Sequence, residues 1–210
     1  MSYCDWSGMG ELMRAYHDEE WGVPVRDDRR QFEFLMMEVM QCGLNWKMML
    51  DKREIFRRCF AGFDYEAVAG FGEDDVERIL STPGMIRSRR KAEAVISDAR
   101  HFIEIRDEFG SFTDYIWSFT GGKTIIYEGH AEGYIPASNG LSERISRDLK
   151  KRGFKYLGGV TVYSHLQAAG LICDHAADCP CMKKVLAMNE STVLPRDEEK
   201  NVVCFGQKEE

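Results

Sequence analysis

The sequence lacks several patterns that would place it in a specialised class of protein. No apolar run approaches the ~20 residues that cross a bilayer, and the N-terminus, with Asp5, Trp6 and Glu11, lacks the charged-then-apolar order of a signal peptide. Alternating strand patterns are nearly absent, and no internal repeat is visible. These absences exclude membrane-spanning and repeat proteins, and we expect a cytoplasmic protein with an all-α fold.

The cysteine content excludes another class. Seven cysteines are an odd number for a framework of disulfide bonds, and cytoplasmic thiols stay reduced. Metal ligation or simple burial therefore explains the cysteines better than cross-linking does.

The charge balance argues against wholesale attraction to nucleic acid. The formal net charge is -7 and the pI is about 5.4, so an evenly acidic surface would repel DNA. Any DNA binding has to rest on local basic patches. Two such patches are Arg87, Arg89, Arg90 and Lys91, and Lys150, Lys151, Arg152 and Lys155. The alternative is that both patches are solvent-exposed helix faces without a binding role, as most runs of charged residues are.

Helical periodicity runs through most of the chain. The spacing and the caps predict helices from Asp27 or Asp28 to Gly43 and over 46–60, 64–69, 73–80, about 87–106, 112–119, 141–151 and 161–171. We expect one helical domain over 1–187, built from two lobes with a long irregular connection at about 120–140. The segment 188–210 is charged and aperiodic, which predicts a loosely held tail.

One acid, Glu38, lies inside an otherwise apolar helix. Phe32, Leu35 and Val39 repeat at helical spacing around it, so Glu38 lies close to the packed face. A charged carboxylate on a dry face would cost several kcal/mol, so we expect it to meet water, a cation or a ligand with hydrogen-bond donors. The alternative is an acid at the helix edge whose head reaches solvent.

Two short segments at opposite ends of the chain supply the side chains that tetrahedral zinc prefers. Cys4 and His17 lie near one end, and His175 and Cys179, one helical turn apart, lie near the other. A closed site with four ligands would fasten the two ends together. Cys173 and Cys181 are rival ligands, and spacing alone favours buried thiols and hydrogen-bonded histidines.

A Pro-Gly turn joins two of the predicted helices into a hairpin. Gly84 allows the backbone N–H groups at the next helix start, with Met85, Ile86 and Arg87, to approach an anion. This hairpin is a candidate clamp for a DNA phosphate.

Several motifs occur together and in order. They are Cys-Asp-Trp at 4–6, Ala-Tyr-His-Asp-Glu-Glu-Trp-Gly-Val-Pro at 15–24, Glu38 followed by Gln-Cys-Gly-Leu-Asn-Trp at 41–46, Gly-Met-Ile-Arg-Ser-Arg at 84–89, Leu-Lys-Lys-Arg-Gly-Phe-Lys-Tyr at 149–156 and Gln-Ala-Ala-Gly-Leu-Ile-Cys-Asp-His at 167–175. With these motifs, roughly residues 3–180 resemble the 3-methyladenine DNA glycosylase I family.

The resemblance implies a fold, a metal and an activity. It implies a helix-hairpin-helix glycosylase fold and one structural zinc per chain at Cys4, His17, His175 and Cys179. It also implies a base pocket that uses Glu38, Tyr16 and Trp46 and is walled by Trp6 and Trp21. The implied reaction releases N3-methyladenine from double-stranded DNA containing alkylated adenine, with Glu38 as the catalytic residue. No lysine nucleophile is suggested beside Glu38, so we expect a monofunctional enzyme that releases the base without cleaving the strand. We also expect the protein to be a monomer.

The sequence departs from the family pattern at three places. Met13 stands where an aromatic pocket residue is frequent, Asn45 replaces a usual Ser, and Gly159-Val160 replaces a segment that commonly contains Thr. These departures bear on substrate range and turnover more than on the fold. Three alternative functions are also open. They are a zinc-stabilised module that binds DNA without removing a base, a hydrolase with a catalytic zinc, and an interaction protein whose aromatics are only core.

Overall fold

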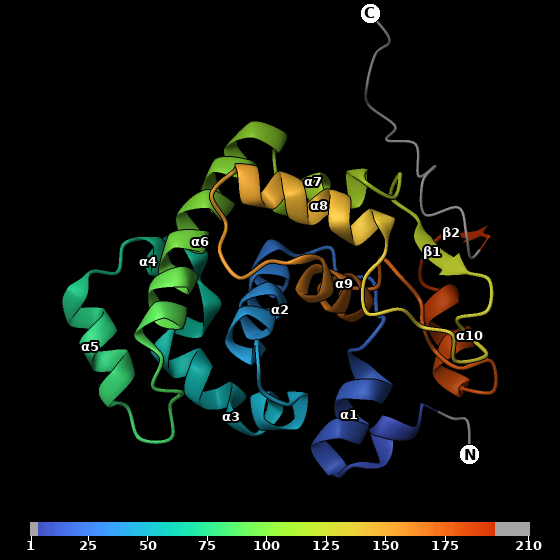
Figure 1. Cartoon of the computed structure of the whole chain (residues 1–210), viewed down its shortest axis with the longest axis horizontal. Helices are drawn as coiled ribbons and strands as arrows, with labels where there is room; N and C mark the ends of the chain where they lie inside the picture. Colours follow the sequence, from blue (N-terminus) through green and yellow to red (C-terminus); the bar gives the residue numbers. More distant parts are fainter. Residues whose placement is uncertain (1–3, 196–210) are drawn as a thin grey trace, which may run out of the picture.

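The computed structural model describes residues 4–195, and these form a mostly helical protein (Figure 1). The elements are η1 (Asp5–Gly8), α1 (Glu11–Glu19), α2 (Asp28–Gln41), α3 (Trp46–Cys59), η2 (Ala61–Phe63), α4 (Tyr65–Ala69), α5 (Glu73–Ser81), α6 (Arg89–Phe109), α7 (Phe112–Ser118), β1 (Thr124–Tyr127), α8 (Gly140–Lys151), α9 (Gly159–Ala168), α10 (Pro180–Leu186) and β2 (Ser191–Leu194). Helices α4 to α6 lie on one side, α1 and α10 on the other, and α2 and α9 between them.

Five of the helices in residues 4–195, α2, α3, α4, α7 and α8, begin where a short polar side chain accepts a hydrogen bond from a free N–H group. Asp27 accepts a hydrogen bond from the Arg30 N–H at 2.8 Å at the start of α2, and Asn45 accepts one from the Met48 N–H at 2.8 Å at the start of α3. Asn45 is therefore an N-cap. Ser caps helices equally well, so this departure from the family pattern keeps the helix start intact.

Helix α2 is the centre of the core. Phe32, Leu35, Met36 and Val39 are completely buried, and the helix packs against α3, α6, α7 and α9. Burying one such side chain stabilises the fold by about 1.5–3 kcal/mol. The packing explains why α2 can carry a carboxyl group at Glu38 in a fixed place.

The predicted hairpin is formed by α5 and α6. Helix α6 begins at Arg89 rather than Arg87, because Ser88 is extended and serves as the N-cap residue. Gly84 in the turn has a φ of +80°, and a Cβ atom there would come within 2.8 Å of the Ile55 side chain. Both facts favour glycine at this position.

Two short strands correct the expectation of a wholly α-helical fold. Strands β1 and β2 pair in parallel, with Thr124 opposite Ser191 and Tyr127 opposite Leu194. The section predicted to be irregular, 120–140, thus contains a strand. So does the beginning of the predicted tail, whose residues 196–210 lie outside the described part of the chain. On its other edge β1 forms a bridge from Ile125 to Ile172.

Along residues 4–195, no helix is both long and apolar enough to span a membrane.

Candidate functional site

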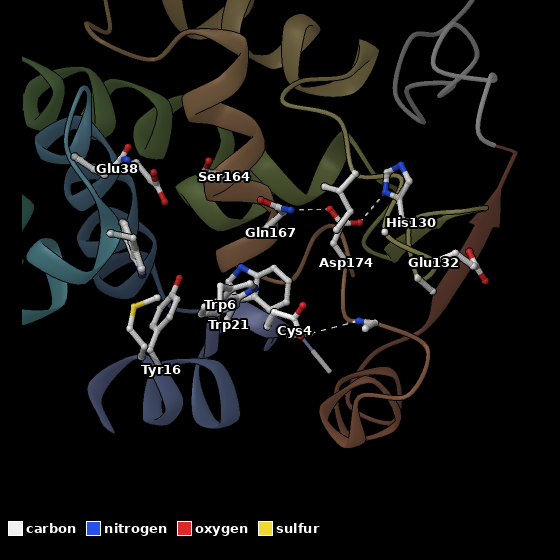
Figure 2. Close-up of a pocket in the computed structure, with 18 residues that line it drawn as sticks. Cys4, Trp6, Tyr16, Trp21, Glu38, His130, Glu132, Ser164, Gln167 and Asp174 are labelled. Carbon is white, nitrogen blue, oxygen red and sulfur yellow. Dashed lines mark hydrogen bonds and ion pairs between the residues drawn. The ribbon is translucent and has the colours of Figure 1, made fainter. Parts of the chain in front are cut away.

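A cavity of about 720 Å³ lies between α1, α2, α3 and α9 (Figure 2). One end is formed by Met13 and Tyr16 of α1, Glu38 and Gln41 of α2, and Trp46 of α3. The indole rings of Trp6 and Trp21 lie next to this end. The structure therefore brings together in one cavity all five residues that the sequence suggested for a base pocket, which are Glu38, Tyr16, Trp46, Trp6 and Trp21.

Glu38 is almost completely buried, at 4% exposure, yet it lines the cavity. Its carboxyl group makes no hydrogen bond to the other residues of the described chain, and burial raises its pKa to about 8. At neutral pH the free protein therefore holds mainly a neutral carboxyl group there. Such a group can both donate and accept a hydrogen bond, and a cationic ligand would favour its ionisation.

Aromatic rings surround this carboxyl group. The Tyr16 ring centroid lies 5.4 Å from that of Trp46 and 6.2 Å from that of Trp6, and the Trp6 and Trp21 centroids are 5.1 Å apart. Burial, and after it the charge of Glu38, raise the pKa of Tyr16 well above its ordinary value. Its hydroxyl group therefore remains a hydrogen-bond donor at physiological pH. The arrangement offers flat apolar faces together with polar groups, as a planar heterocycle requires.

The cavity is acidic. Asp5, Glu38, Glu132 and Asp174 line it, and no lysine or arginine is among the described lining residues. A carboxylate-rich, partly desolvated space favours a cationic or donor-rich ligand and disfavours a phosphate group.

A second polar group lies at the end of the cavity remote from Glu38 (Figure 2). The buried Asp174 carboxylate accepts hydrogen bonds from the Tyr163 hydroxyl and the Gln167 amide, both at 2.7 Å, and lies 2.7 Å from His130 Nδ1. Because a carboxylate is an acceptor, His130 donates through Nδ1. No sequence pattern predicted a role for these residues.

The four predicted metal ligands meet beside the indole rings of Trp6 and Trp21. Cys4, His17, His175 and Cys179 are buried, and their ligand atoms all lie within 4.8 Å of one another. Cys179 Sγ is 3.5 Å from both His17 Nε2 and His175 Nδ1, and Cys4 Sγ is 3.8 Å from His175 Nδ1. The cluster could therefore hold one metal ion with four protein ligands.

Neighbouring groups orient both histidines toward this cluster. His175 Nε2 lies 3.2 Å from the Trp21 carbonyl oxygen, and His17 Nδ1 lies 2.7 Å from Asp18 Oδ1. When His175 Nε2 and His17 Nδ1 donate to these acceptors, the other ring nitrogens, His175 Nδ1 and His17 Nε2, keep their lone pairs and face the cluster. Burial lowers the pKa of His175 to about 4, so its ring is neutral, as a ligand must be.

The rival cysteines are placed differently. Cys181 Sγ lies 3.9 Å from His17 Nδ1, the atom that faces away from the cluster, and 3.7 Å from Asp18 Oδ1. It belongs to a second, three-residue group with His17 and Asp18, whereas Cys173 belongs to neither group.

The sequence model of the methyladenine glycosylase family matches residues 6–183. This chain belongs to the methyladenine glycosylase family.

Two curated relatives align with this chain over nearly their whole length. The chain is 41% identical over 181 residues to DNA-3-methyladenine glycosylase 1 of Escherichia coli K12, which covers 86% of this chain and 97% of the relative. It is 36% identical over 178 residues to the DNA-3-methyladenine glycosylase of Haemophilus influenzae, and that alignment covers 85% of this chain and 96% of the relative.

Solved structures of the methyladenine glycosylase family share the fold. A crystal structure of 3-methyladenine DNA glycosylase I has a TM-score of 0.81 at 44% identity, over 85% of this chain and 98% of that one. The Staphylococcus aureus enzyme, solved to explain its recognition of 3-methyladenine, has a TM-score of 0.80 at 35% identity, over 86% and 96%.

The predicted DNA-contacting residues of this family member do not all reach the surface. Gly84 and Arg87 are exposed and Ile86 is half-buried, but Met85 is 7% exposed and packs into the core. Arg89, which the sequence placed in the basic patch, forms ion pairs with Glu73 and Glu77 of α5. Only part of the patch is thus available to a phosphate.

The fold brings to the cavity further candidate residues that were not predicted from the sequence. Gln167 and Asp174 lay inside a motif that was recognised as a whole, and His130 lay in the section predicted to be irregular. Met13, one of the departures from the family pattern, does line the cavity, whereas Gly159 and Val160 start α9 away from it.

Proposed function

We propose that this protein removes 3-methyladenine from double-stranded DNA by hydrolysing the N-glycosidic bond. The observation that carries the proposal is the acidic cavity in which Glu38 faces the rings of Tyr16 and Trp46. The two curated relatives named above are DNA-3-methyladenine glycosylases, and the family match covers all of these residues.

The chemistry follows from the charge of the damaged nucleotide. Methylation at N3 makes the base cationic and weakens its glycosidic bond, so the enzyme mainly has to find and hold the base. Flipping the nucleotide out of the duplex costs a few kcal/mol, and a damaged, poorly stacked base costs least. Trp46 then stacks on the extruded ring, and Tyr16 supplies a polar contact.

Glu38 is the proposed catalytic residue. Its carboxyl group accepts hydrogen bonds from the exocyclic amine edge of the base, and the cationic ring draws it toward its ionised form. A negative charge next to the cationic base holds that base in the pocket while the glycosidic bond breaks.

The reaction stops at base release. Strand cleavage by a glycosylase requires an amine nucleophile at the sugar, and no lysine lines the cavity in residues 4–195. Lys91, the lysine nearest in sequence to the turn of the hairpin, is buried. It donates to the Met40 and Cys42 carbonyl oxygens at 2.7 and 2.6 Å. It is therefore committed to a structural contact.

The metal cluster fits structural zinc, one ion per chain. Zn–S and Zn–N bonds of ~2.3 and ~2.0 Å in tetrahedral geometry place sulfur and nitrogen about 3.5 Å apart, close to the observed 3.5–3.8 Å. Two thiolates and two imidazoles fill all four positions, which argues against a catalytic zinc with an open site. The ion would fasten helix α1 and the segment before it to the segment before α10.

DNA binding is assigned to the hairpin of α5 and α6, used as a helix-hairpin-helix element. Exposed Gly84 and Arg87 contact a backbone phosphate, and the acidic cavity repels phosphates while it accepts the base. We also propose that the enzyme acts as a monomer.

The deciding experiment is to incubate duplex DNA treated with a methylating agent with the protein and to identify the free bases. We expect 3-methyladenine, and at least ~100-fold slower release by Glu38→Gln. A Glu54→Gln variant, altered at an exposed acid on α3, serves as the control and should match the wild type. Binding of methylated DNA without release of any base would show instead a DNA-binding module.

A further inference from the structure

The cavity is longer than a purine ring requires. At about 720 Å³ it extends from Glu38 past the Trp6 and Trp21 indoles to the group of Gln167, Asp174 and His130 (Figure 2). This far end is built from other elements than the base end, because Gln167 belongs to α9 and the other two lie in the loops after β1 and before α10.

The far end is polar and ordered. Three side chains, Tyr163, Gln167 and His130, hold the completely buried Asp174 carboxylate. His130 itself is 4% exposed and its Nδ1 is committed to Asp174, while its Nε2 has no hydrogen-bond partner among residues 4–195. The carbonyl oxygen of Gln167 likewise has no partner in that range, and neither atom is sealed from the cavity.

Both of these unpartnered atoms accept hydrogen bonds. A neutral imidazole that donates through Nδ1 is an acceptor at Nε2, and the amide that donates its N–H to Asp174 presents its oxygen. The neighbouring carboxylates of Asp174 and Glu132 add negative potential. The far end is therefore complementary to a hydroxyl or ammonium group, and it repels the phosphodiester of the DNA.

The geometry of adenine says which part of a ligand points there. In adenine, the exocyclic amine and N7 lie at the end of the ring system opposite N3. A base that presents its amine edge to Glu38 directs its N3 substituent away from Glu38, toward the far end.

We propose that Gln167, His130 and Asp174 form a subsite for the N3 substituent, selective for substituents that end in a hydroxyl or amino group. The proposal rests on the function proposed above. It extends the substrate class from 3-methyladenine to N3-alkyladenines whose substituent carries a hydrogen-bond donor.

The test compares three free bases by titration calorimetry at pH 7.5: 3-methyladenine, 3-(2-hydroxyethyl)adenine and its donor-free isostere 3-propyladenine. We expect the hydroxyethyl base to bind about 3- to 10-fold tighter than the propyl base, which is the usual gain from one net hydrogen bond. Gln167→Leu and His130→Phe should each bring this ratio close to one. Glu128→Gln, altered at an exposed residue of the same loop that does not line the cavity, should leave it unchanged.

The ratio compares two ligands on one protein, so a general loss of folded protein does not affect it. Equal affinities of the hydroxyethyl and propyl bases in the wild type would overturn the subsite, as would a ratio that survives both substitutions. A protein that neither binds 3-methyladenine nor releases it from DNA would instead refute the proposed function itself.

Discussion

Lys91 Nζ lies 2.7 Å from the carbonyl oxygen of Met40, at the end of the helix that carries Glu38. It also donates to the Cys42 carbonyl at 2.6 Å, so one buried ammonium group satisfies two of the free carbonyls at this helix end. Lys91 belongs to the first turn of α6, directly after the turn that joins the two helices of the hairpin. The same side chain thus connects the proposed DNA-contacting turn to the loop between Glu38 and Trp46.

We predict that Lys91→Met lowers the free energy of unfolding by about 2 kcal/mol, because hydrogen bonds from a charged donor are lost and carbonyls are left unsatisfied. The rate of base release should fall by more than the loss of folded protein explains, since the loop from Cys42 to Asn45 loses its hydrogen bond to Lys91. Urea unfolding and single-turnover release measure the two effects. Lys47→Met is the control, because within residues 4–195 the Lys47 ammonium group pairs only with Asp51, at an exposed position on α3. Unchanged turnover in the folded Lys91→Met protein would rule out the positioning role.

Glu38 makes stability depend on pH in a defined direction. Burial raises its pKa from 4.5 to about 8, so the folded state resists ionisation that the unfolded state allows. The stabilisation is complete below pH 4.5 and is lost as the pH rises through about 8. At roughly 1.4 kcal/mol per pKa unit, the loss amounts to at most about 5 kcal/mol.

We therefore predict that wild-type stability falls between pH 5 and pH 9 by several kcal/mol more than that of Glu38→Gln. Asp98, whose pKa burial also raises to about 8, titrates in both proteins and cancels in the comparison. Denaturant unfolding at the two pH values measures the difference. Parallel stability curves for the two proteins would mean that Glu38 is already ionised at neutral pH in the free protein.

The proposed metal site gives a prediction about composition. We expect one zinc per chain by elemental analysis, and loss of that zinc in Cys4→Ser and Cys179→Ser, because each removes a thiolate from a closed tetrahedral site. Melting temperature should fall in both variants. Cys181→Ser is the matched control, since Cys181 lies beside the outward-facing nitrogen of His17. Zinc retained by Cys179→Ser but lost from Cys181→Ser would assign the fourth ligand to Cys181.

Arg87 should contribute to DNA affinity without affecting which base is chosen. We predict that Arg87→Ala weakens binding of damaged and undamaged duplexes by the same factor and reduces the slope of log K against log salt by about 1, as expected for one lost phosphate contact. Fluorescence anisotropy at several salt concentrations measures this slope. Arg89→Ala is the comparison. Because Arg89 is paired with Glu73 and Glu77, this substitution should change the slope of log K against log salt less than Arg87→Ala does.

Local patterns predicted much of this fold, and contacts between distant segments explain what they missed. The helix of Glu38 follows from its apolar spacing and from Asp27, which caps it as expected. Cys4 and His175, 171 residues apart, were connected by family resemblance and not by spacing. His130 and Asp174 escaped notice because nothing local signals a hydrogen bond across 44 residues. Lys91 lies in a run of charged residues, and the sequence of that run does not show that the first turn of α6 directs Lys91 into the core.

The strand pair was missed for a similar reason, because each strand has four residues and neither sequence, Thr-Ile-Ile-Tyr or Ser-Thr-Val-Leu, alternates between polar and apolar residues. Strand β2 lies after residue 183, beyond the part of the chain that matches the family. It holds β1 through the register from Thr124 to Tyr127, and the Glu128 N–H donates to the Leu194 carbonyl at 2.9 Å. The loop that follows β1 carries His130 and Glu132 into the cavity.

We predict that ending the chain after Met188 lowers the melting temperature, because β1 loses the hydrogen bonds of one edge while its bridge to Ile172 remains. Hydrogen exchange should quicken at Ile125–Tyr127 and in the loop of His130, and release of 3-methyladenine should change less than stability, because Glu38, Tyr16 and Trp46 belong to other elements. A chain ending after Leu194 is the matched control, since it keeps β2. Equal protection of β1 in the two truncated proteins would show that the loop is held by the bridge to Ile172 alone.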